Sequence, residues 1–104
     1  MTMRKAPTKI TEKLEKKIVN AVTSAAMQSN EFNGFLRFEY EVDWSNFPVS
    51  LKFKALFHSE AAIATLKHDG QQNRIEKYVL NALMKQGVRV KDIRKLMTFE
   101  VVDN

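Results

Sequence analysis

The chain has 104 residues, enough for one domain that buries a core without staples, and its 44% hydrophobic content is typical of folded proteins. It has no cysteine, which excludes disulfides, thiolate nucleophiles and thiolate metal sites. The net charge of +5 is modest, and solubility alone can require it. The basic start is not followed by an apolar signal segment and no apolar run is long enough to span a bilayer, so we expect a cytoplasmic protein with no membrane contact.

Positive charge is concentrated toward both ends of the sequence. Residues 1–17 hold six basic and two acidic side chains, residues 18–66 hold three and five, and residues 67–104 hold eight and five. These three segments therefore carry +4, −2 and +3. Such an asymmetry is compatible with a polyanionic partner.

We expect residues 1–7 to form a flexible basic arm and residues 8–104 to form a single domain. A first helix is predicted to begin near Thr8 or Thr11, both of which suit an N-cap, and to end near Ser29. Its apolar residues recur at helical spacing and form the side expected to be buried: Ile10, Leu14, Ile18, Val22 and Ala25.

Two segments of alternating polarity follow, 35–44 and 49–58, joined by residues 45–48. Period-two alternation predicts strands with one buried face, and the short connection predicts a hairpin. The residues expected on the buried face are Leu36, Phe38, Tyr40, Val42 and Trp44 in the first strand and Val49, Leu51, Phe53, Ala55 and Phe57 in the second.

The other face of the hairpin is charged. A four-residue connection places Glu41 opposite Lys52 and Glu39 opposite Lys54, and opposite charges favour this register. The carboxylates of Glu39, Glu41 and Asp43 could hold a hard cation. An ion-paired, solvated face is the simpler interpretation, and we favour it.

Aromatic residues gather where the hairpin turns. Trp44 and Phe47 could stack on a base or on a partner if they were exposed. The favoured alternative is that Trp44 points inward and Phe47 folds over it, since large aromatic side chains usually indicate burial.

Two helices and a strand are expected after the hairpin. Their predicted bounds are 60–67 for a short helix, 72–86 for a longer helix and 97–102 for the strand. Ser59 suits the N-cap of the short helix, Asp69-Gly70 separates the two helices, and Gly87 suits the end of the second. Residues 88–95 could form a strand, a turn of helix or both.

The predicted order of elements is α-β-β-α-α-β. This order indicates an α+β fold, a two-layer sandwich in which helices cover one face of a three-stranded, mainly antiparallel sheet. No Gly-rich phosphate loop, nucleophilic triad or metal-ligating cluster can be placed in the sequence. We therefore expect a protein that is not an enzyme and holds no cofactor.

The element order, with a turn between the two later helices, resembles the type II KH arrangement of RNA-binding domains. In that family the turn is a Gly-x-x-Gly loop that clamps the nucleic-acid backbone. The matching stretch here is Gly70-Gln71-Gln72-Asn73, so the first glycine is present and Asn73 stands at the position of the second. The resemblance implies an RNA partner held near this turn.

The predicted function is a small binding module that contacts RNA or another polyanion through a basic helical face. The residues expected at this contact are Lys67, His68, Gly70, Gln71, Gln72, Arg74, Lys77, Lys13 and Lys16. The alternative is a protein–protein interaction domain or a homodimeric accessory protein with no nucleic-acid role. Its expected partner surface is apolar and consists of Phe35, Leu56, Leu80 and Met84.

Overall fold

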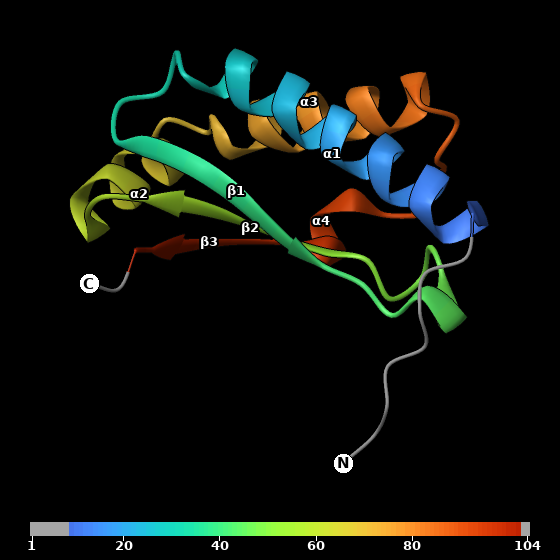
Figure 1. Ribbon diagram of the computed structural model, residues 1–104. Helices are drawn as coiled ribbons and strands as arrows, with labels where there is room; N and C mark the ends of the chain where they lie inside the picture. The colour runs from blue at the N-terminus through green and yellow to red at the C-terminus, as the bar shows by residue number, and fades with distance from the viewer. Residues whose placement is uncertain (1–8, 103–104) are drawn as a thin grey trace.

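The computed structural model describes residues 9–102, so the arm expected at residues 1–7 lies outside the described residues. The elements in chain order are α1 (Lys9–Ser29), β1 (Phe35–Glu41), the 3-10 helix η1 (Trp44–Asn46), β2 (Lys52–Phe57), α2 (Glu60–His68), α3 (Gln72–Lys85), α4 (Ile93–Leu96) and β3 (Met97–Val101). This order confirms the predicted α+β fold, with α4 as one added turn of helix before the last strand (Figure 1).

The fold has two layers. The strands lie in the order β1-β2-β3, and α1 and α3 pack against each other over one face of the sheet, while α2 lies beyond one end of it (Figure 1). Within the described residues, no helix is both long and apolar enough to cross a membrane.

The sheet is mixed, so the prediction of a mainly antiparallel sheet is wrong. β1 and β2 pair antiparallel, whereas β2 and β3 pair parallel. The reason lies in α3, which carries the chain back along the sheet to the end where β2 began, so that β3 runs in the same direction as β2 (Figure 1).

The predicted register of the hairpin is confirmed, because Glu39 pairs with Lys54 and Glu41 with Lys52. A β-bulge between Phe35 and Arg37 changes the start of β1. Phe35 therefore turns into the core and Leu36, which the alternation places inside, is exposed.

The connection between β1 and β2 is longer than predicted. Asp43 caps η1, accepting hydrogen bonds at Oδ1 from the Ser45 backbone N–H at 3.0 Å and the Ser45 hydroxyl at 2.7 Å. The Ser50 hydroxyl bonds to the Asp43 backbone N and O, both at 2.8 Å, and closes the loop. β2 consequently begins at Lys52, and Val49 is exposed rather than buried.

Local signals place the helix ends correctly. The Ser59 hydroxyl accepts a hydrogen bond from the Ala62 backbone N–H at 3.1 Å and caps α2. Gly87 adopts a positive φ directly after α3, as a helix C-terminal glycine does. α1 has nearly its predicted bounds, but Ile10 in its first turn is 71% exposed because it extends past the core.

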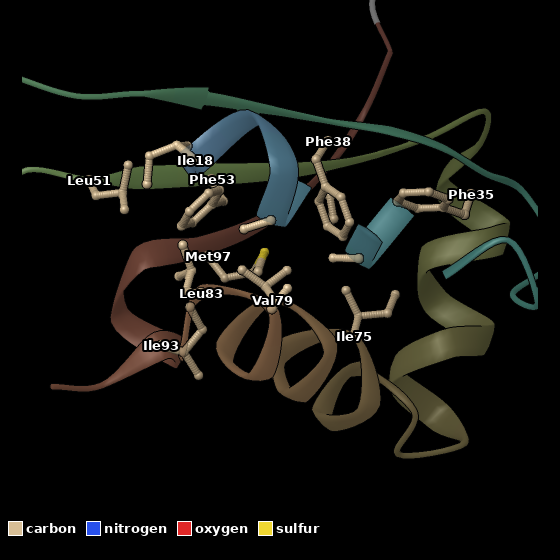
Figure 2. Close-up of a cluster of buried hydrophobic side chains, with 14 of the residues drawn as sticks. Ile18, Phe35, Phe38, Leu51, Phe53, Ile75, Val79, Leu83, Ile93 and Met97 are labelled. Atoms are coloured by element: carbon tan, nitrogen blue, oxygen red, sulfur yellow. The ribbon is translucent and has the colours of Figure 1, made fainter. Parts of the chain in front are cut away.

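The core lies between the sheet and the pair α1 and α3 (Figure 2). Phe53 and Phe57 of β2 are fully buried at its centre, which fits the central position of that strand. Side chains from every layer converge on them, among them Ile18, Phe38, Ile75, Val79, Leu83 and Met97.

Candidate nucleic-acid interface

The residues predicted to contact RNA divide between two ends of the helix layer. α1 and α3 run antiparallel, since Glu31, just after α1, bonds to Arg74 in the first turn of α3. The α2–α3 turn, with Lys67 and Gly70, therefore lies near the end of α1, whereas Lys13 lies near its beginning (Figure 1).

The α2–α3 turn is closed by its own side chains. Gly70 has φ +68°, while Asn73 is already helical. Gln71 donates from Nε2 to the Asp69 backbone oxygen at 3.5 Å and accepts at Oε1 from Arg74 at 3.3 Å. His68 is exposed, and its Nδ1 lies 3.3 Å from the Asp69 carboxylate. That carboxylate works against an anion bound at this turn.

Arg74 belongs to a network that holds the loop after α1 against α3. Its Nη2 donates to the Glu31 carboxylate and to the Tyr78 hydroxyl, both at 3.2 Å, and the Tyr78 hydroxyl also donates to Glu31. The guanidinium carbon lies 5.6 Å from the centroid of the Phe32 ring. Since Glu31 offsets the charge of Arg74, this arginine contributes more to joining the two elements than to the net charge of the surface.

A groove runs between α1 and α3 on the side away from the sheet. Polar and apolar side chains line it together: Ser24 and Gln28 from α1 and Tyr78, Asn81 and Lys85 from α3, with Ala82 and Met84. An α-helix has 3.6 residues per turn, so Lys17 and Lys13, two and three turns before Ser24, fall on the same side of α1. Because α3 ends at Lys85, which lines the groove together with Ser24, these two lysines lie on α1 beyond the groove.

The carboxylates of the two helices lie off this groove. Glu15 points to β1, where its carboxylate accepts a hydrogen bond from the Tyr40 hydroxyl at 3.4 Å. The pKa of Tyr40 is raised, mainly because the hydroxyl is partly buried and secondly because the negative charge of Glu15 lies beside it. Glu12 lies about a third of a turn away from the Ser24 side of α1. Glu76 of α3 is 7% exposed on a different side of its helix, beside Asp92 and Arg94, and its burial raises its pKa.

Four lysines lie in the groove or on the adjoining surfaces of α1 and α3, and only Lys85 lines the groove itself. Lys13, Lys17, Lys77 and Lys85 are exposed, and none makes an ion pair with another described residue. The sequence pattern predicted Lys13 and Lys77 as RNA contacts. It did not predict Lys17, and it included Arg74, which the structure shows bonded to Glu31 where the end of α1 meets the start of α3. Lys16 is exposed as well and lies about 80° from the Ser24 side of α1.

The predicted apolar partner surface is incomplete. Phe35 is 8% exposed and belongs to the core because of the β-bulge, and Leu56 is 6% exposed on the opposite side of β2. The prediction that these two residues form a surface is therefore wrong. Met84 is exposed and Leu80 is half-buried, one helical turn apart on α3.

The charged face of the sheet carries equal numbers of positive and negative side chains around its hollow. A hollow there is lined by three lysines and three glutamates among its residues: Lys52, Lys54, Lys95, Glu39, Glu41 and Glu100. Within the described residues no group of three histidines or carboxylates could hold a metal ion. Asp43 is engaged as the cap of η1, where its hydrogen bonds from Ser45 lower its pKa.

Trp44 and Phe47 cover the edge of the core. Their ring centroids are 5.5 Å apart, and both are half-buried against the core cluster. The interpretation of an inward Trp44 covered by Phe47 agrees with this packing. No protein family, curated protein or solved structure matches the chain.

Proposed function

We propose that the chain is a small, non-enzymatic cytoplasmic module that binds RNA or a similar polyanion along the α1–α3 groove. One observation carries this proposal: four lysines without an ion-pair partner among the described residues lie in the groove or beside it, Lys85 in its lining, Lys77 on α3, and Lys13 and Lys17 on α1 beyond its end. A polyanion placed there meets cations and neutral hydrogen-bonding groups, and the Glu31 carboxylate after α1 is already bonded to Arg74.

The α2–α3 turn is the weaker candidate for the same role. Arg74 there is paired with Glu31, and Lys67 lies two residues from the Asp69 carboxylate. The turn also lacks the second glycine that the KH-like arrangement would use to approach a phosphate. The groove thus supports polyanion binding better than the turn does, although both lie on the same helix layer.

The proposal is tested by fluorescence anisotropy of labelled RNA at several salt concentrations. The variant Lys13→Gln, Lys17→Gln, Lys85→Gln lowers the net charge of the chain from +5 to +2 by changes in the groove and on the adjoining part of α1. Its matched control, Lys52→Gln, Lys54→Gln, Lys95→Gln, gives the same net charge but alters the sheet face.

We expect the groove variant to lose most of the affinity and the control to retain it. Each lysine that contacts a phosphate contributes about 0.7 to 0.9 to the slope of log affinity against log salt, so the variant should flatten that slope by about 2 to 3. Equal weakening by both variants would show that net charge alone attracts RNA. A wild-type protein that binds no polyanion at low salt would refute the proposal.

Protein association is the second candidate function. Met84 and Met27 are exposed on the outer side of α3 and α1, and exposed methionines are common at protein-binding surfaces. Pairing through the β1 edge is less favoured, because a β-bulge and the charges of Arg37 and Glu39 are features that discourage edge pairing. Sedimentation over a wide concentration range tests the homodimer, which a constant monomer mass would exclude.

A further inference from the structure

We infer that the α1–α3 groove selects double-stranded RNA, which it holds through phosphates and 2′-hydroxyls rather than through bases. This inference rests on the proposed function and adds the class of polyanion. It depends on three features of the described surface: the length of the lysine array in and beside the groove, the neutral side chains between the lysines, and the lack of an open aromatic platform.

The lysine array is long and rigid. Ser24 and Lys85 line the groove together, and Lys13 lies eleven residues, about 16 Å, beyond Ser24 at 1.5 Å per residue. Lys77 lies eight residues, about 12 Å, from Lys85 in the other direction. The cations therefore extend over about 28 Å, with Lys77 and Lys85 on α3 and Lys17 and Lys13 on α1 beyond the end of α3. A stiff duplex can follow such an extended array without being ordered first.

Neutral donors and acceptors lie between the cations. Asn20, Ser24 and Gln28 are exposed on α1, and Asn81 is exposed on α3. The shallow minor groove of duplex RNA displays 2′-hydroxyls, each a donor and an acceptor, between rows of phosphates. A surface that alternates lysines with amides and a hydroxyl matches this pattern, whereas duplex DNA offers no 2′-hydroxyl to these side chains.

Proteins that bind single-stranded RNA usually stack its bases on aromatic side chains, and the described groove offers one half-buried tyrosine for this. Tyr78 is the aromatic side chain in the groove; it is half-buried, its ring centroid lies 6.3 Å from that of Phe32, and its hydroxyl is bonded to Glu31 and Arg74. Trp44 and Phe47 pack on each other and on the core. A single strand bound here would lose chain freedom without base stacking to offset that loss.

The test compares three labelled ligands of equal phosphate number: duplex RNA of about 20 base pairs, duplex DNA of the same sequence and an unstructured single-stranded RNA. We expect the duplex RNA to bind about tenfold more tightly than either of the others. The variant Asn20→Ala, Asn81→Ala changes two exposed side chains and no lysine. It should reduce the RNA-over-DNA preference to less than about threefold while leaving the salt slope unchanged, since the slope depends on lysine–phosphate contacts.

The outcomes separate this inference from the proposed function. Tighter binding of single-stranded RNA, equal binding of duplex RNA and duplex DNA, or an unchanged preference in the asparagine variant would each overturn the inference while leaving a polyanion-binding groove. Binding of none of the three ligands at low salt would overturn both.

Discussion

Gly34 allows the loop after α1 to approach α2, and its replacement by alanine should be the most disruptive glycine change in the described chain. Its φ is +88°, and a Cβ there would lie 2.6 Å from the Cβ of Ala62 and 3.2 Å from Nε2 of His58. Its carbonyl also accepts a hydrogen bond from the His58 backbone N–H at 3.0 Å. The local chain can move little without losing that bond.

Two costs add in Gly34→Ala. An alanine in the left-handed region costs about 1 to 2 kcal/mol, and forcing a methyl group against Ala62 costs about 1 to 3 kcal/mol. The expected loss is therefore about 2 to 5 kcal/mol, a large part of the 5 to 15 kcal/mol that folded domains usually have. Urea denaturation followed by circular dichroism measures this loss.

Gly70→Ala is the matched control, because Gly70 has φ +68° and a Cβ added there would meet no atom within 4 Å beyond its chain neighbours. It should cost only the backbone term, about 1 to 2 kcal/mol. Adding Ala62→Gly to Gly34→Ala removes the closest contact, so the double variant should lose less stability than the two single losses combined. Equal losses for Gly34→Ala and Gly70→Ala would refute the argument from close approach.

Three further predictions concern α2 and α3. Burial raises the pKa of the Glu76 carboxyl above its ordinary 4.5, so the folded protein holds the carboxyl proton more tightly than the unfolded chain does. The free energy of unfolding therefore falls as the pH rises from 4.5 through the raised pKa of the folded state. Glu76→Gln should raise the urea midpoint at pH 7, and the midpoints of the two proteins should converge below about pH 4.5. Ser59→Ala removes the cap of α2 and should lower the free energy of unfolding by about 1 kcal/mol in the same assay, and no loss would contradict the role of the cap. Tyr78→Phe removes the hydroxyl that bonds to Glu31 and should cost about 0.5 to 1.5 kcal/mol, with faster amide exchange in residues 30–34; unchanged exchange there would show that the network does not hold the loop.

Local patterns in the sequence were sufficient for most of the elements. The alternation of the hairpin and its opposite charges predicted the Glu39–Lys54 pairing, and Ser59 and Gly87 predicted helix ends. These signals work because they depend on neighbours within a few residues. The β-bulge that turns Phe35 inward has no such signal, since a run of alternating residues contains no sign of one extra residue.

Contacts between distant segments were beyond local patterns. The parallel pairing of β2 with β3 depends on how α3 packs across the sheet. The bond from Arg74 to Glu31 joins residues 43 positions apart, which no local pattern can predict. The sequence analysis therefore counted Arg74 as a cation for RNA, although the folded chain pairs it with Glu31. The candidate groove could be found only in part, because Ser24 and Gln28 of α1 come to lie beside Asn81 and Lys85 of α3 only once the two helices pack.

The parallel β2–β3 pair also sets an order for folding. β1 and β2 are joined by residues 42–51, whereas residues 58–96 separate β2 from β3, a connection about four times as long. Two doublings of loop length add about 1.2 kcal/mol to the entropy cost of closure. The hairpin can therefore form early from contacts near in sequence, and β3 can dock only when α2 and α3 have brought the chain back. The last strand of the chain completes the sheet, and its edge is the part of the sheet that we expect to open first.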